Sequence, residues 1–191
     1  MLSKAEALKI ENLDLMRNLY LHTIILATIL LLYAAKSALA QSSYVLPYPS
    51  FMPGSIFYKL NLIKEEVLKY WYFGDFGQFT YNLKQSDKYL VEAKTLFDYK
   101  QYLLANTALQ KSGKYFEKIY PNLLSAKKNG KKFAEKETML REAAQKHTED
   151  LTKLKSTVPS VFDWTPERES PTTLNLLESL DASIKLRVKR L

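Results

Sequence analysis

The stretch that decides the fold is residues 133–159, FAEKETMLREAAQKHTEDLTKLKSTVP. Spacings of three and four residues place one set of its side chains on a single face of an α-helix: Phe133, Leu140, Ala144, His147, Leu151, Leu154 and Val158. Glu137 is the one charged interruption of that face. Because Pro159 has no amide hydrogen with which to continue a helix, we predict an amphipathic helix that ends there.

Upstream of this stretch, three further segments repeat the helical period. The first follows Ser55, a candidate N-cap, and its apolar positions are Ile56, Leu60, Ile63, Val67 and Tyr70. The second follows two glycines, and its positions are Phe79, Leu83, Ser86, Leu90, Ala93 and Phe97. The third follows a break at residues 98–100, and its positions are Ala105, Leu109, Ser112, Phe116 and Ile119. We expect Pro121 to kink or split the third helix and Asn129-Gly130 to end it.

Downstream, residues 159–171 contain three prolines and predict an irregular crossing that carries Phe162 and Trp164. A final helix is predicted from about Thr172, with apolar positions Leu174, Leu177, Ile184, Val188 and Leu191. Since no stretch alternates with a period of two for long enough, we predict no strands. The sequence therefore predicts an all-α domain over residues 55–191, a bundle of about five amphipathic helices.

The N-terminal segment has the pattern of a signal peptide. Residues 19–35 are mostly apolar, and the small residues Ala38 and Ala40 precede Gln41 in the pattern that signal peptidase cleaves. We therefore expect residues 1–40 to be a signal peptide, with translation starting at Met16 because residues 1–15 carry a net negative charge. An uncleaved anchor is the alternative. Either outcome predicts that residues 41–191 lie outside the cytoplasm, with residues 41–54 as an extended segment rich in proline and aromatic residues.

Composition narrows the classes of function. The chain has no cysteine and a net charge of +8. Removing residues 1–40 takes away four basic and three acidic side chains, which leaves 24 basic and 17 acidic residues and a net charge of +7. This charge favours anionic partners. The densest basic patch predicts binding to an anionic envelope polymer or lipid surface, with a solvated turn as the alternative: Lys127, Lys128, Lys131 and Lys132. We expect no nucleic-acid partner, because an exported protein rarely meets one.

Catalysis is not expected, and no cofactor is implied. Only one histidine, His147, follows the signal segment, and neither a Gly-x-Ser-x-Gly motif nor a glycine-rich phosphate loop is present. We interpret His147 as a core histidine. The alternative is a metal ligand or pH switch, for which Asp150 is the one ligand type three or four residues away on the helix.

The aromatic run Tyr70-Trp71-Tyr72-Phe73 faces all sides of a helix. We expect residues 41–54 and 159–171 to cover it, with a ligand-stacking or membrane-interface patch as the alternative.

Several short motifs resemble one bacterial family. These are Leu46-Pro47, Pro53-Gly54-Ser55 with Tyr58-Lys59-Leu60, the run Asp87-Lys88-Tyr89-Leu90 with Glu92-Ala93, and Lys146-His147 with the stop at Val158-Pro159. They are similar to a family of exported or membrane-anchored helical proteins that is catalogued as a domain of unknown function. The resemblance covers roughly residues 45–160. It departs at Gly54-Ser55-Ile56, where the family has Asp-Ser-Pro. It implies an extracytoplasmic helical domain and transfers no catalytic residue.

Three classes of function remain. The first is a non-catalytic envelope interaction or scaffolding protein. The second is the outer sensor or regulatory domain of an envelope signalling system, with a cation bound through His147. The third, an enzyme of unrecognised type, has the least support because the sequence shows few residues that could form a catalytic set.

Overall fold

The computed structural model describes residues 16, 20–28, 42–167 and 170–191. The chain divides into two units, residues 1–41 and residues 42–191. The predicted cleavage site at Ala38, Ala40 and Gln41 lies outside the described residues. Residues 20–28 are helical, but no helix in the described part of the chain combines the length and hydrophobicity needed to cross a membrane.

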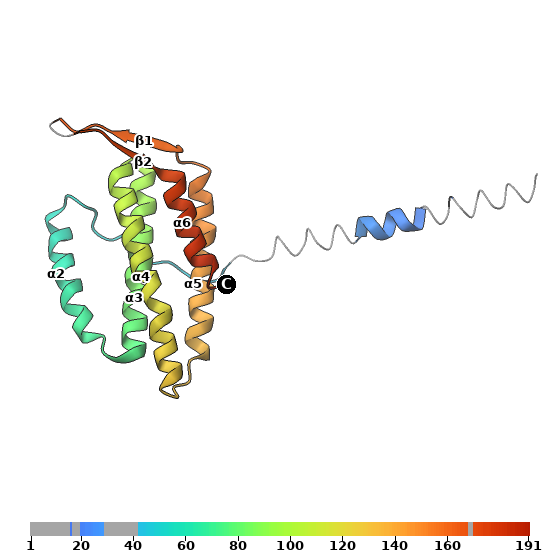
Figure 1. The fold of residues 1–191 in the computed structure, drawn as a ribbon, viewed down its shortest axis with the longest axis horizontal. Helices are drawn as coiled ribbons and strands as arrows, with labels where there is room; N and C mark the ends of the chain where they lie inside the picture. Colours follow the sequence, from blue (N-terminus) through green and yellow to red (C-terminus); the bar gives the residue numbers. More distant parts are fainter. Residues whose placement is uncertain (1–15, 17–19, 29–41, 168–169) are drawn as a thin grey trace, which may run out of the picture. The chain divides into compact units, whose positions relative to one another are not determined.

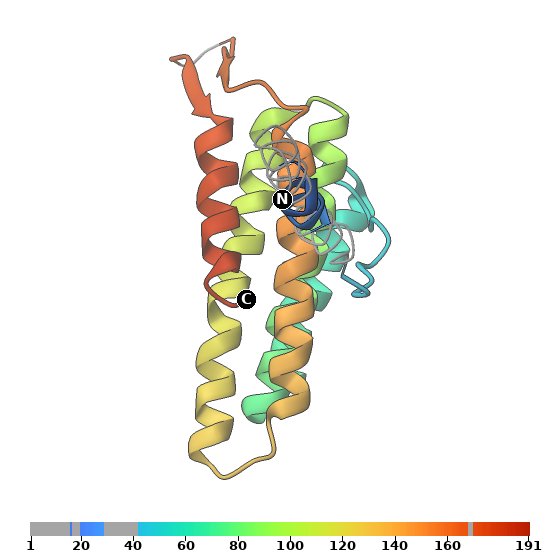
Figure 2. The same ribbon diagram turned by 90° about the vertical axis from the view of Figure 1, so that its right-hand side faces the viewer.

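The second unit is a helical bundle. Its described residues form the helices α2 (Ile56–Trp71), α3 (Gly74–Asp98), α4 (Tyr102–Lys128), α5 (Ala134–Lys155) and α6 (Leu176–Val188). The helices α2 to α5 run alternately down and up, α2 lies along the outside of α3, and α6 packs against α4 and α5 (Figures 1 and 2). The predicted all-α bundle of about five amphipathic helices is confirmed.

A small hairpin corrects the prediction that no strand occurs. Strands β1 (Val161–Trp164) and β2 (Thr172–Asn175) pair antiparallel, with Val161 opposite Asn175. Each strand has only four residues, which is too short for alternation to show in the sequence. The last helix therefore begins at Leu176 instead of Thr172, and the ring of Phe162 packs 4.9 Å from that of Tyr102 at the end of the bundle.

The turns between helices lie close to where glycine and proline predict them. Gly130, at φ +68°, follows α4 in a left-handed conformation that favours glycine. Gly77 lets the start of α3 approach α2, because a Cβ atom there would lie 2.8 Å from the carbonyl carbon of Tyr72. Of the predicted kink or split at Pro121, the split does not occur, since α4 continues through it. Proline removes one amide, and Pro121 is exposed, so water can bond the carbonyl that loses its partner.

Two hydrophobic clusters make up the core. One lies toward the hairpin: Leu90, Ala93, Leu96, Phe97, Ala105, Ala108, Leu109, Leu151, Leu154, Leu176 and Leu180. The other lies toward the loop between α4 and α5: Phe79, Leu83, Phe116, Ile119, Leu123, Leu140, Ala143 and Ala144. Most predicted apolar positions of α3, α4 and α5 are buried in these clusters, so the faces predicted for these three helices are confirmed.

For α2, the predicted orientation is wrong. Ile56, Ile63 and Val67 are 72%, 64% and 65% exposed, and the one buried residue of the helix is Glu65. The period correctly predicts an amphipathic helix, but the helix packs on α3 by its polar face.

The predicted core face of the last helix is correct only in part, because Leu174, Leu177 and Ile184 pack half-buried against the cluster near the hairpin. The buried residues of α6 are Leu176, Leu180, Ser183 and Arg187, whereas Val188 and Leu191 are exposed. Arg187, which is not among the predicted apolar positions, is fully buried.

The segment before α2 covers the bundle only in part. Leu46 and Met52 pack against the cluster near the hairpin, whereas Tyr48 and Phe51 are exposed. Tyr70, Trp71 and Phe73 are exposed as well, so the expectation that residues 41–54 and 159–171 cover this aromatic run is wrong.

Candidate functional site

A layer of buried polar side chains separates the two hydrophobic clusters. Along α3, Ser86 falls between Leu83 of one cluster and Leu90 of the other. Ser112 on α4 and His147 on α5 occupy the corresponding positions, and α6 adds Ser183 and Arg187. We call the set the polar layer: Ser86, Asp87, Ser112, His147, Ser183 and Arg187.

His147 is the centre of the polar layer and is fully buried. Its Nε2 atom lies 2.8 Å from Oδ1 of Asp87, and the Nε–H of Arg187 donates to its Nδ1 at 3.0 Å. Because a guanidinium has only donors, Nδ1 must be the accepting nitrogen and the proton of the neutral ring sits on Nε2. His147 therefore donates to Asp87 and accepts from Arg187.

Arg187 fixes three helices to one another. Its Nη2 donates to Ser112 Oγ of α4 at 2.7 Å, and its Nη1 donates to Ser183 Oγ at 2.6 Å. The guanidinium also lies over the ring of Phe116, 5.0 Å from its centre. Together with the bond to His147 of α5, these contacts give each nitrogen of the buried guanidinium a hydrogen-bond acceptor. The planar guanidinium presents its N–H groups in the directions that these acceptors need.

Hydrogen bonds continue from both ends of the polar layer. Ser86 and Ser112 donate to each other's carbonyl oxygens at 3.1 and 2.8 Å, which brings the backbones of α3 and α4 close together. At the other end, the hydroxyl of Tyr44 donates to Oδ2 of Asp87 at 2.6 Å. This bond ties the extended segment before α2 to the bundle.

The electrostatics keep His147 neutral. Burial lowers the pKa of His147, and the positive charge of Arg187 acts in the same direction, whereas the bond to Asp87 opposes it. Burial also lowers the pKa of Arg187 to about 9, which leaves it protonated at neutral pH. The negative charge of Asp87 and the positive charge of Arg187 thus lie on either side of the neutral imidazole and offset each other inside the bundle.

The two predicted metal candidates have different partners. His147 bonds to Asp87 and Arg187, while Asp150 pairs with Lys94 and, at 3.3 Å, with Lys146. Burial alone would raise the pKa of Asp150, but the two lysines outweigh it and hold that pKa below its ordinary value. Both ring nitrogens of His147 are already engaged, and no cluster of three potential metal ligands occurs among the described residues.

The predicted basic patch lies at the loop between α4 and α5, and all four lysines are exposed. Lys131 pairs with Asp75 at 2.9 Å, and this bond lowers the pKa of Asp75 to about 2. Lys127 lies over the ring of Phe133, 5.1 Å from its centre. In the part of the chain that the structure describes, Lys128 and Lys132 have no ion-pair partner. Of the four charges, the structure pairs only that of Lys131 with a carboxylate among the described residues, so the others can meet an anionic partner.

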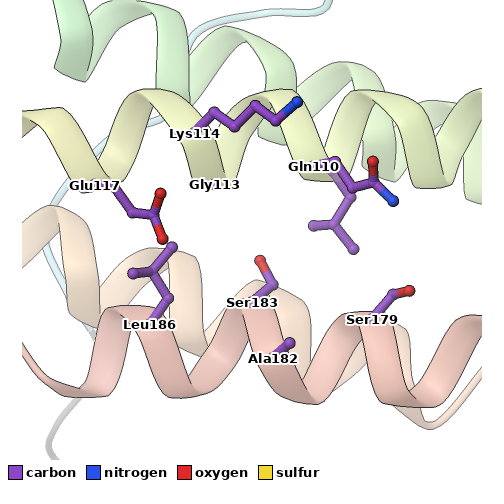
Figure 3. A pocket seen from close by; sticks show the side chains of 9 residues that line it. Gln110, Gly113, Lys114, Glu117, Ser179, Ala182, Ser183 and Leu186 are labelled. Atoms are coloured by element: carbon purple, nitrogen blue, oxygen red, sulfur yellow. The ribbon is translucent and has the colours of Figure 1, made fainter.

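A groove of about 370 Å³ runs between α4 and α6. Figure 3 shows Glu117 of α4 pointing toward Leu186 of α6, with Ser179 and Ser183 of α6 along the same side of the groove. Its ionisable lining residues are one lysine and one glutamate. This composition resembles an ordinary groove between two packed helices.

A second polar cluster attaches α2 to α3. Glu65 of α2 forms an ion pair with Lys88 and accepts from Tyr89 Oη at 3.3 Å. Tyr58 Oη donates to Glu92 Oε1 at 3.0 Å, and burial raises the pKa of Glu92. We call this set the α2 dock: Glu65, Lys88, Tyr89, Tyr58 and Glu92. It explains why the polar face of α2 is the inner one.

Several of these residues escaped prediction as interacting groups. Asp87, Lys88, Tyr89 and Glu92 appeared in the sequence only within the motif that carries the family resemblance. The sequence contains one indication of the polar layer. Ser86, Ser112 and His147 each interrupt an otherwise apolar helix face near its middle. Nothing comparable marks Tyr44 or Arg187, whose burial depends on how distant segments pack.

One comparison with known proteins identifies a family for this chain. A family model for a domain of unknown function, DUF5667, matches residues 50–160. This covers more than half of the chain, so the chain belongs to that family. No curated protein and no solved structure matches the chain.

Proposed function

We propose that this chain is a non-catalytic helical domain of the bacterial cell envelope that binds another envelope component. The proposal places residues 41–191 outside the cytoplasm and takes an anionic polymer, lipid surface or acidic protein as the partner. The observation that carries it is the exposed end of α4 and the loop after it, where Lys128 and Lys132 have no ion-pair partner among the described residues. The polar layer supports it too, because Asp87 and Arg187 each bond to His147 inside the bundle and all three side chains are buried.

Crosslinking in native cells, followed by identification of the captured partner, tests the proposal. We expect the chain in the envelope fraction, crosslinked to an envelope protein or polymer. Recovery of the chain only from the cytoplasm would overturn the proposal.

Charge reversal tests the basic patch itself. Lys128→Glu with Lys132→Glu should weaken binding to an anionic polymer such as a teichoic acid, and binding of the wild type should fall as salt rises. The matched control is Lys153→Glu with Lys185→Glu, which changes the net charge equally at exposed positions on α5 and α6. Equal loss of binding in both variants would show that net charge, and not this patch, binds the polymer.

A further inference from the structure

The outward face of α2 is an apolar stripe exposed on the second unit. Its members are large aliphatic or aromatic side chains between 59% and 78% exposed: Ile56, Leu60, Ile63, Val67 and Trp71. At 100° per residue they fall within one side of the helix, opposite Glu65. Figure 1 shows α2 along the outside of the bundle, so this side points away from α3. Contiguous exposed apolar surface of this kind marks an interaction site.

Positive charges border the stripe. Lys59 and Lys64 lie on its two flanks in the helical projection and are exposed. Glu66 pairs with Lys69 at 3.4 Å, and Glu65 is buried against Lys88. The exposed charged side chains of α2 are thus three lysines and one glutamate, which give this surface a net charge of +2. An apolar stripe between two lysines is the pattern of a helix that lies in a lipid headgroup layer.

Aromatic side chains stand at both ends of the stripe. Tyr70 and Phe73, beside Trp71, are 76% and 86% exposed. At the other end, Phe51 and Phe57 stack with their ring centres 5.3 Å apart, and both are exposed. Tryptophan and tyrosine favour the boundary between hydrocarbon and headgroups, because their rings are apolar and their N–H or O–H groups bond to water.

A lipid surface suits this face better than a second copy of the chain. Two α2 helices packed stripe to stripe would bring Lys59 and Lys64 of both copies together at one seam, where Glu66, next to Lys59 in the helical projection, offsets only one of the two positive charges of each copy. Like charges at that seam repel, whereas anionic headgroups neutralise the same lysines. If the apolar run 19–35 is retained as an anchor, only 20 residues separate it from α2, which keeps the helix within reach of the same bilayer.

We propose that α2 is an interfacial membrane helix, with the stripe in the headgroup region of an anionic bilayer and Lys59 and Lys64 at its phosphates. The α2 dock holds the inner face of the helix on the domain through Glu65. Binding then needs no rearrangement of the core. This inference rests on the proposed envelope function and identifies a membrane-binding surface for it.

Trp71 provides the test, because the chain has two tryptophans and Trp164→Phe leaves Trp71 as the only one. The full chain carrying Trp164→Phe is mixed with vesicles of phosphatidylcholine alone or with one quarter phosphatidylglycerol. In the anionic vesicles we expect Trp71 emission to shift to shorter wavelength and to be quenched by brominated lipids. Since the reporter sits on α2, anchoring by the N-terminal segment alone does not produce this result.

A matched pair of variants isolates the stripe. Val67→Glu should abolish the shift and the lipid quenching, while Val188→Glu, the same change at an exposed valine of α6, should keep both. Circular dichroism checks that each variant remains helical.

Three results would overturn the inference. Trp71 remaining accessible to iodide in vesicle-bound chain would show that α2 does not insert. Shielding of Trp71 without lipid that rises with protein concentration would identify a second copy as the occupant. Shielding without lipid at every concentration would identify the chain's own residues 19–35. None of these results bears on the cellular location, which the crosslinking experiment tests separately.

Discussion

At the residue scale, Arg187 holds a positive charge inside the bundle, and Asp87 holds a negative one on the far side of His147. Taking such charges from water costs several kcal/mol each, as an order of magnitude, so the arrangement persists only because each charge is bonded. All three nitrogens of the guanidinium have partners, and Asp87 accepts from His147 and Tyr44. Removing one charge alone should therefore be much more damaging than removing a charge on the surface.

Arg187→Met should lower the free energy of unfolding by about 3–5 kcal/mol, because it leaves Asp87 as a buried charge without its compensating cation. Chemical denaturation measures the change. Arg141→Met, at an exposed position of α5, is the matched control and should stay within about 0.5 kcal/mol of the wild type. A small effect at both positions would mean that water or a rearranged side chain replaces the guanidinium.

A pH dependence follows from His147. Because its pKa is lower in the folded chain than the ordinary value of about 6.5, the unfolded chain binds more protons between those two values. Stability should be full above about pH 6.5 and should fall as pH drops toward the folded pKa, by at most about 1.36 kcal/mol per pH unit. The carboxylates Asp75 and Asp150, whose pKa values are lowered, contribute stability that is lost only below about pH 4.

His147→Gln isolates this contribution, because a glutamine can donate to Asp87 and accept from Arg187 but does not titrate. Denaturation midpoints of both proteins from pH 7.5 to 4.5 measure the difference. We expect the wild type to lose stability relative to the variant between pH 6.5 and 5. Parallel curves would show that His147 does not change its protonation on unfolding in this range.

At the element scale, sequence periodicity predicts where a helix forms better than which face it buries. The faces of α3, α4 and α5 could be predicted because Leu and Phe dominate their stripes and each helix packs on two or more neighbours. For α2, the same argument fails because Glu65, Tyr58 and their partners on α3 satisfy one another. For α6, burial of Arg187 depends on Ser112 and His147, which are 75 and 40 residues away in the chain.

Glu65 should control the attachment of α2. Glu65→Ala removes the partner of Lys88 and a hydrogen bond of Tyr89, so we expect about 1–3 kcal/mol less stability for the docked helix. Hydrogen exchange should show lost protection in residues 56–71 and unchanged protection in α3 to α5.

Glu66→Ala is the neighbouring control, because Glu66 is exposed and its one ion pair among the described residues is with Lys69 on the same helix. Its exchange should match that of the wild type. Loss of protection throughout the bundle in Glu65→Ala would contradict a local role for the α2 dock.

At the scale of the whole molecule, the polar layer fixes the relative heights of four helices. The hydrophobic clusters alone would allow neighbouring helices to slide along one another, because contacts between aliphatic side chains have no preferred direction. The bonds from Arg187 to α4 and α5, and from His147 to Asp87 of α3, are satisfied at one register. A buried polar group that specifies register at a cost in stability is known from coiled coils, and we expect the same role in this bundle.

An apolar layer tests that role. The triple variant Asp87→Leu, His147→Leu and Arg187→Met removes both charges together, so it should regain most of the stability that Arg187→Met alone loses. Without the polar layer, neighbouring registers come closer in energy, and the variant should show reduced dispersion of side-chain NMR resonances and increased binding of a hydrophobic dye. The Arg187→Met single variant, which keeps Asp87 and His147, is the reference for both measurements. A triple variant that is less stable than the single one would show that the layer stabilises the bundle outright, and a stable triple variant with fully dispersed resonances would show that the two hydrophobic clusters set the register unaided.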